Sequence, residues 1–141
     1  MTTLKDILAI KSSTQVRVSY RDTDQMGHAY YSQYLVWFEI GRTELIRDHG
    51  LNYRDLESTG VFLPVRECAC RYLSPACYDD LLTIHTTIVS LSPSSIKFVY
   101  RIDRPEDGVL IAKGNTHHPF VSSERKIMRV GFQVFKVDKK T

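Results

Sequence analysis

The sequence predicts an α+β fold in which one long helix packs against one antiparallel sheet. A half-buried strand pattern comes first, a strongly apolar stretch with helical spacing follows it, and the remaining chain consists of β-rich segments with short connections. Short connections favour antiparallel pairing between consecutive strands. The 141 residues are enough for one hydrophobic core. We therefore expect a single domain over residues 1–141, with an N-terminal extension at 1–14 and a tail at 138–141.

Two segments carry the first half of this prediction. Residues 15–20 alternate, with Val16, Val18 and Tyr20 on one face, which predicts a half-buried strand. Residues 31–49 show helical spacing, and the glycine that follows them is a natural C-terminal stop. The first turns of this helix are apolar almost all round, so other elements must cover it on several sides, as a curved sheet would.

Only extended segments are expected after a short helical turn at residues 53–58. These segments are rich in valine, isoleucine and threonine, and Pro105-Glu-Asp-Gly108 is a strong turn signal between two of them. Together with the first strand they predict a sheet of five to six strands. The expected later strands are 61–72, 81–91, 95–103, 109–121 and 128–137.

Composition and charge exclude several classes of function. Hydrophobic residues make up 43% of the chain and charged residues 25%, which is typical of a globular protein. The net charge is +3 without a long run of lysine and arginine, so we expect no nucleic-acid partner. No apolar stretch approaches the ~20 residues that a membrane span needs, and the first ten residues lack the pattern of a signal peptide. We therefore expect a cytoplasmic protein.

The cysteine and histidine patterns predict neither a disulfide framework nor a metal site. Cys68, Cys70 and Cys77 are odd in number and lack C-x-x-C spacing. His117 and His118 are neighbours on a predicted strand and must face opposite sides of it. Unpaired thiols are typical of a reducing compartment, which agrees with a cytoplasmic location.

The most informative segment lies at residues 21–28, where Arg-Asp-Thr-Asp-Gln-Met-Gly-His runs straight into the apolar helix. This junction brings a carboxylate close to a helix N-terminus, where unpaired N–H groups and the positive end of the helix dipole point outward. A base or nucleophile beside such oxyanion donors is the arrangement that acyl transfer requires.

The same segment begins a wider resemblance that spans residues 16–137. The motifs that carry it are Tyr20 to His28, Tyr34-Leu35, residues 38–44, residues 72–81 and residues 112–117. In these motifs the chain resembles the hotdog-fold acyl-CoA thioesterases of the 4-hydroxybenzoyl-CoA thioesterase type. The resemblance implies a hotdog fold, in which a curved antiparallel sheet of five to six strands wraps around a long central helix. It also implies hydrolysis of an acyl-CoA thioester.

The resemblance assigns catalytic roles to two positions. Asp24, the second aspartate of the motif, would act either as a nucleophile that forms a mixed anhydride or as a general base on water. A backbone N–H at or near Tyr31, where the helix starts, would polarise the thioester carbonyl. Asp22 is interpreted as a turn or salt-bridge residue.

Five further residues are candidate substrate contacts. Gly27 would shape the loop or allow the substrate to approach closely, and His28 would contact the substrate or form hydrogen bonds within the loop. Residues from two subunits, around Val65 and Tyr72, would set the depth of the acyl pocket. Lys97 is either a contact for the phosphates of coenzyme A or an ordinary surface charge.

The resemblance implies neither a metal nor a redox cofactor, and coenzyme A enters only as part of the substrate. Hotdog subunits pair side by side into a continuous sheet with active sites at the interface, so we expect a homodimer or a homotetramer. Two other functions stay open at this point: a thioesterase for acyl-carrier-protein substrates, and a non-catalytic acyl-CoA-binding protein of the same fold.

Overall fold

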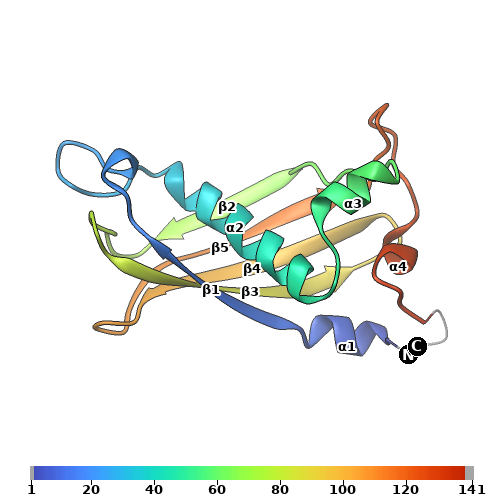
Figure 1. The fold of residues 1–141 in the computed structure, drawn as a ribbon, viewed down its shortest axis with the longest axis horizontal. Coiled ribbons are helices and arrows are strands. Elements are labelled where there is room, and N and C mark those ends of the chain that lie inside the picture. Colours follow the sequence, from blue (N-terminus) through green and yellow to red (C-terminus); the bar gives the residue numbers. More distant parts are fainter. Residues whose placement is uncertain (1, 139–141) are drawn as a thin grey trace.

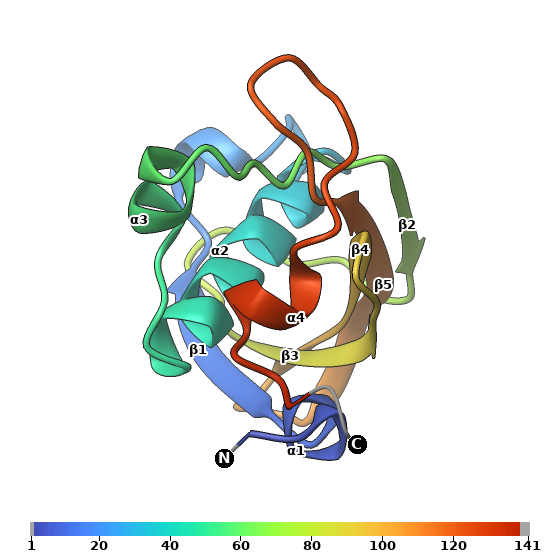
Figure 2. The ribbon, with the colours of Figure 1, turned by 90° about the vertical axis from the view of Figure 1, so that its right-hand side faces the viewer.

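A five-stranded antiparallel sheet curves around one long helix in the computed structural model, which describes residues 2–138 (Figure 1; Figure 2). The strand order is β1-β3-β4-β5-β2. The strands are β1 (Lys11–Arg17), β2 (Glu67–Tyr72), β3 (Leu81–Leu91), β4 (Ser95–Arg104) and β5 (Val109–Pro119). The helices are α1 (Leu4–Leu8), the 3-10 turn η1 (Tyr20–Asp22), α2 (Gln33–Asp48), α3 (Tyr53–Ser58) and α4 (Gly131–Val134).

The helix α2 lies in the hollow of the sheet, and Figure 2 shows the strands wrapping around it. Its buried residues, such as Trp37, recur at helical spacing and face the strands. Phe38 stacks on Tyr100 of β4, with the ring centroids 4.4 Å apart. The helix approaches the sheet most closely at Gly41, because a Cβ atom there would lie 2.8 Å from Ile84 Cγ2. The core therefore sits between α2 and the central strands.

The N-terminal part of the sheet differs from the prediction. β1 begins at residue 11, inside the range 1–14 that we assigned to an extension. Tyr20, expected to face the core, instead opens the turn η1, and its side chain is 77% exposed. The cause is local, because the Asp22 carboxylate accepts the N–H of Ser19 at 3.0 Å and turns the chain out of the sheet.

The later elements follow the prediction closely with two exceptions. The long helix and the 53–58 turn are confirmed as α2 and α3, and the three long strands as β3, β4 and β5. Within 61–72 only the last six residues form a strand, β2, because Pro64 has no N–H to donate to a ladder.

The expected strand at 128–137 is wrong, because this segment forms the short helix α4. The N–H of Gly131 donates to the carbonyl of Pro93 at 2.8 Å, and Phe135 is fully buried. The periodicity of a short apolar run cannot distinguish a strand from a buried helical turn. Here the contact with Pro93 favours the helical turn. Residues 139–141 of the expected tail lie outside the described residues.

Candidate active site

The loop between η1 and α2 holds the Asp24 carboxylate in a defined position. Its Oδ1 atom accepts the N–H of Met26 at 2.8 Å and the N–H of His28 at 3.2 Å. The backbone N–H of Asp24 donates to the carbonyl of His28 at 2.8 Å and closes the loop. Gly27 has a φ of +78°, which an L side chain rarely adopts and which this tight loop requires. One carboxylate oxygen is therefore tied to the backbone, whereas Oδ2 accepts no hydrogen bond from the described residues.

The Asp24 loop is hydrogen-bonded to the segment between β2 and β3. The N–H of Ala29 donates to the carbonyl of Ala76 at 2.8 Å, and the N–H of Tyr78 donates to the carbonyl of Gly27 at 3.2 Å. The phenol of Tyr34 on α2 accepts the N–H of Ala76 at 3.3 Å. The position of the Asp24 loop therefore depends on residues 76–78.

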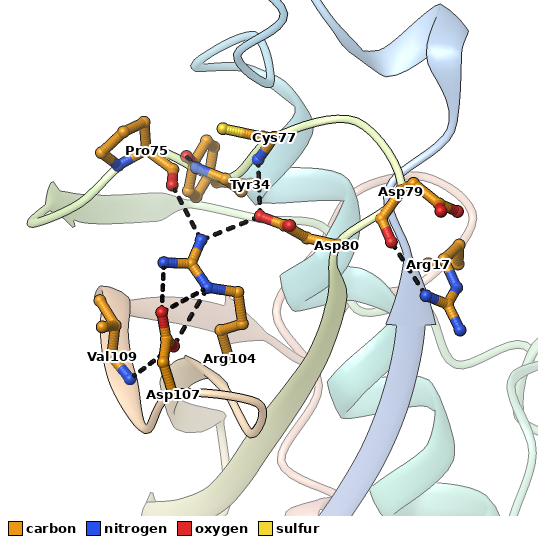
Figure 3. Close-up of polar contacts among 10 residues, drawn as sticks. Arg17, Tyr34, Pro75, Cys77, Asp79, Asp80, Arg104, Asp107 and Val109 are labelled. Carbon is orange, nitrogen blue, oxygen red and sulfur yellow. Dashed lines mark hydrogen bonds and ion pairs between the residues drawn. The ribbon is translucent and has the colours of Figure 1, made fainter.

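An ion-pair network around Arg104 holds the segment between β2 and β3 in turn (Figure 3). The Arg104 guanidinium donates to Asp80 Oδ2 at 2.9 Å and is also paired with Asp107 at the tip of the β4–β5 hairpin. Asp80 Oδ2 accepts the N–H of Cys77 at 2.9 Å as well. Hydrogen bonds from Arg104 to Asp107 and Asp80 raise the pKa of the guanidinium above its ordinary value. Arg104 thus links the hairpin tip to the segment that is hydrogen-bonded to the Asp24 loop.

The start of α2 presents backbone N–H groups without protein acceptors. The carbonyl of Tyr30 accepts the N–H of Gln33 at 3.0 Å, and the carbonyl of Tyr31 accepts the phenol of Tyr72 at 2.8 Å. Among residues 2–138, no acceptor is hydrogen-bonded to the N–H of Tyr31 or of Ser32, and the Ser32 side chain does not cap the helix. These amides point out of the helix as candidate oxyanion donors.

A cavity of about 450 Å³ joins the carboxylate to the start of the helix. Four of the predicted site residues meet in it: Asp24, His28, Tyr31 and Tyr72. Sequence reasoning did not assign the rest of its wall, although Leu-Ser-Pro directly after a strand signals a bend there. These further lining residues are Ala29, Tyr30, Tyr34, Leu73, Ser74 and Pro75.

The other predicted contacts lie elsewhere in the subunit. Gly27 belongs to the Asp24 loop but does not line the cavity, and Val65 lies in the exposed segment before β2. Lys97 is on β4 between the buried residues Ile96 and Phe98, so its side chain leaves from the outer face of the sheet, opposite α2. Within one subunit, Lys97 and Val65 therefore do not reach the Asp24 cavity.

A second cavity, of about 760 Å³, lies at the other end of β2 and was not anticipated. It is formed by the segment that leads into β2 and by the chain that follows β5. Apolar side chains dominate its wall, and two arginines stand among them. The lining residues are Glu57, Phe62, Leu63, Pro64, Arg66, Pro119, Val121, Ser122, Ser123, Arg125 and Ile127.

A buried hydrogen-bond chain links β4 and β5 in the core. His118 is fully buried, whereas its neighbour His117 is partly exposed on the opposite face. His118 Nδ1 lies 3.2 Å from the carbonyl of Leu63, and Nε2 lies 2.7 Å from the hydroxyl of Thr116, which also bonds the phenol of Tyr100. Burial lowers the pKa of His118 to about 4. A neutral ring, with its proton on Nδ1, satisfies every partner in this chain.

No candidate metal centre occurs in the described part of the chain, where no three His, Cys, Asp or Glu side chains are grouped to hold an ion. None of the helices within residues 2–138 is long and apolar enough to cross a lipid bilayer.

Comparison with known proteins identifies the family. The model of the thioesterase-like superfamily matches residues 18–140, which is most of the chain. The chain belongs to the thioesterase-like superfamily. It is 38% identical over 95 residues to the acyl-CoA thioester hydrolase YbgC of Escherichia coli, covering 67% of this chain and 71% of YbgC. It is also 38% identical over 113 residues to YneP of Bacillus subtilis, covering 80% of this chain and 81% of YneP.

Several solved structures share the fold. Protein TT1821 of Thermus thermophilus superimposes with a TM-score of 0.82 at 33% identity, covering 89% of this chain and 95% of that one. The DHNA-CoA thioesterase of Staphylococcus aureus gives a TM-score of 0.82 at 28% identity, with 85% and 80% covered. The 4-hydroxybenzoyl-CoA thioesterase of a Pseudomonas strain gives 0.80 at 23% identity, with 91% and 99% covered, which shows the fold alone. The hotdog fold is therefore confirmed, and the family places the chain among the thioester hydrolases.

Proposed function

We propose that the protein hydrolyses an acyl-CoA thioester to a free acid and coenzyme A, with Asp24 as the reacting side chain. One observation carries this proposal: Asp24, with one carboxylate oxygen tied to the backbone and the other without a hydrogen bond, lines the same cavity as Tyr31, whose N–H is unpaired at the start of the helix. The coenzyme A substrate is supported by the name of the relative YbgC, an acyl-CoA thioester hydrolase. The substrate is then a small molecule, and no further cofactor takes part.

The geometry suits a two-stage acyl transfer. The thioester carbonyl oxygen accepts the N–H of Tyr31, so negative charge that develops on that oxygen meets a fixed donor worth about 2.7–4 kcal/mol in the transition state. Asp24 Oδ2 either attacks the carbonyl carbon or removes a proton from the attacking water. The tetrahedral intermediate then collapses, the C–S bond breaks and the thiolate of coenzyme A leaves. On the general-base route the thiolate takes the proton that Asp24 removed from water, and the free acid is formed directly. On the nucleophilic route the thiolate takes a proton from water, and a second water hydrolyses the mixed anhydride to the free acid and regenerates Asp24.

A second copy of the chain would complete the site. β2 ends the sheet and pairs only with β5. Leu73 donates its N–H to Ile111 of the β5 ladder, so alternation turns the N–H groups of Tyr72, Cys70 and Cys68 toward the open edge. These groups offer a second strand a full set of hydrogen bonds, which supports a homodimer as the basic unit, with a homotetramer as a pair of such dimers.

The charges on β2 support one register for that dimer. Glu67 and Arg71 are exposed on the same face of the strand, two residues on either side of Ala69. A two-fold axis at Ala69 sets Glu67 opposite the partner's Arg71, and the reverse, in an antiparallel pair. The same axis brings the partner's Val65 to Leu73, and so to the Asp24 cavity. This arrangement accounts for the predicted contribution of Val65 to the acyl pocket.

A cytoplasmic location fits the proposed reaction. Cys68, Cys70 and Cys77 are free thiols in the structure, which suits a reducing compartment.

The substitution Asp24→Asn tests the function. It keeps the shape of the loop but removes the anionic oxygen, so we expect kcat on acyl-CoA substrates to fall by about 10²–10⁴-fold. Asp22→Asn is the matched control, because Asp22 caps Ser19 outside the cavity and its loss should change kcat only slightly. Turnover by Asp24→Asn at the level of Asp22→Asn would contradict the proposal. Oxygen-18 entering the Asp24 carboxylate in a single turnover would identify the nucleophilic route.

A further inference from the structure

Tyr72 contacts the catalytic machinery through its phenol. It is the last residue of β2, and its hydroxyl donates to the carbonyl of Tyr31 at 2.8 Å. Its ring is 47% exposed and meets the ring of Tyr34 edge-on, with the centroids 4.8 Å apart. Tyr34 is only 3% exposed, and its own hydroxyl is bonded to the N–H of Ala76. The phenol of Tyr72 is therefore held from behind by a fixed aromatic ring.

The carbonyl that Tyr72 binds belongs to a peptide unit with a free N–H at its other end. A trans peptide is planar, and its C=O and N–H point in opposite directions. Fixing the carbonyl of Tyr31 therefore fixes the direction of the Ser32 N–H. The preceding peptide is fixed in the same way, because the carbonyl of Tyr30 accepts the N–H of Gln33 at 3.0 Å and thereby directs the N–H of Tyr31.

The hydrogen bonds that hold the carbonyls of Tyr30 and Tyr31 come from different parts of the structure. The Tyr30 carbonyl is held by the first turn of α2 itself. The Tyr31 carbonyl is held only by the phenol of Tyr72 among the described residues, and the Ser32 side chain makes no capping bond that would hold the turn. Without the phenol, the Tyr31–Ser32 peptide is free to rotate toward water. Tyr31, which carries the proposed oxyanion donor, would then be anchored on one side only.

We propose that Tyr72 is a positioning residue: by holding the carbonyl of Tyr31 it fixes this residue between two anchored peptides, so that the Tyr31 N–H is aimed at the thioester oxygen before the substrate arrives. This inference rests on the proposed thioesterase function and deepens it. It gives Tyr72 a role in kcat, in place of the role in acyl binding that its position in the cavity wall alone would indicate.

The phenol is suited to this role over a wide pH range. Burial, together with the nearby Cys70, raises the pKa of Tyr72 to about 12. The hydroxyl therefore keeps its proton at neutral and moderately alkaline pH and remains a donor to the Tyr31 carbonyl.

The substitution Tyr72→Phe isolates the hydroxyl, because the ring and its packing on Tyr34 are kept. We expect kcat to fall about 10- to 100-fold, somewhat less than the roughly 10²–10³-fold loss on removing an oxyanion donor outright, with KM changed less than about threefold. Tyr20→Phe is the matched control, since that ring is 77% exposed and meets Tyr78 outside the cavity. Circular dichroism of each variant identifies the folded fraction to which kcat is normalised.

Two results would overturn the inference. A rise in KM at constant kcat would make Tyr72 a substrate contact only, and unchanged constants would leave the phenol without a role in turnover. The proposed function is tested separately, because it predicts an inactive Asp24→Asn variant whatever Tyr72→Phe shows. If Asp24→Asn is inactive while Tyr72→Phe matches Tyr20→Phe, the positioning role alone fails.

Discussion

At the residue scale, His118 makes the stability of the fold depend on pH, although it lies outside the Asp24 loop. The ring is buried and neutral, with Nδ1 donating to the carbonyl of Leu63 and Nε2 accepting from the hydroxyl of Thr116. Protonation would place a charge in the core close to Arg42, whose own charge adds to the effect of burial on the pKa. The cost of charging this ring is therefore a cost to the folded state.

Stability should consequently fall as the pH drops. The pKa of His118 is about 4 in the folded chain and near ~6.5 when unfolded, so the unfolded chain binds the proton first between these values. We expect the contribution of His118 to the free energy of unfolding to be fully present above about pH 6.5. The free energy of unfolding should fall by up to about 3 kcal/mol through this residue as the pH drops to 4. Urea unfolding at several pH values measures the loss. His118→Gln should show a shallower pH dependence and His117→Gln the wild-type one; equal slopes in all three proteins would refute the assignment.

The residues of the candidate site were predictable from sequence to the extent that their geometry is local. The Asp24 turn and the positive φ of Gly27 follow from residue types over a few positions, and the amide of Tyr31 follows from where the helix starts. Lys97 lies on the outer face because its neighbours along β4 face the core, which the alternation already indicated. Its assignment as a phosphate contact is not supported within the subunit. Val65 lies outside the Asp24 cavity of its own subunit, and only the proposed dimer would bring it to such a cavity.

Among the helices and strands, too, those defined by local sequence were predicted and those defined by distant contacts were not. The strands β3, β4 and β5 have long alternating patterns with clear turns between them, and so their bounds were predicted to within two residues. By contrast, α4 is defined by its docking against the carbonyl of Pro93, a contact between segments that no local pattern contains. The start of β1 was missed because Lys-Ser-Ser-Thr at residues 11–14 is polar on an edge strand.

The segment between β2 and β3 should lose its order without the Arg104 network. Asp80→Ala removes the acceptor shared by Arg104 and the N–H of Cys77, and we expect a loss of about 1–3 kcal/mol in the free energy of unfolding. Because the Asp24 loop is bonded to residues 76–78, kcat should also fall. Thermal unfolding and steady-state kinetics measure the two effects. Glu106→Ala, an exposed change at the same hairpin tip, is the control; if it matches Asp80→Ala, the network has no special role.

At the scale of the whole molecule, the open edge of β2 decides whether one chain is a complete enzyme. The Asp24 cavity and the larger cavity lie at opposite ends of this strand. An antiparallel pair of β2 strands would place the Asp24 cavity of each subunit beside the larger cavity of the other subunit. Two composite sites would then be formed per dimer, each walled by both chains.

The register proposed for this dimer predicts a charge-reversal pattern. Glu67→Arg or Arg71→Glu alone places like charges opposite each other twice, so the dissociation constant should rise about tenfold or more, or roughly 1–2 kcal/mol. The double variant, with both changes, restores opposite charges and should return the dissociation constant toward that of the wild type. Analytical ultracentrifugation at graded protein concentrations measures it. Single variants that dimerise like the wild type would exclude the register centred on Ala69.

The way Asp24 is held has a consequence for how such a protein can diversify. The carboxylate is fixed by the main-chain amides of Met26 and His28, and the proposed oxyanion donors are main-chain amides as well. The side chains at Met26, His28 and Tyr31 therefore take no part in holding the reacting groups. Mutation can exchange them, and with them the preferred acyl group, while the chemistry is inherited unchanged through the backbone.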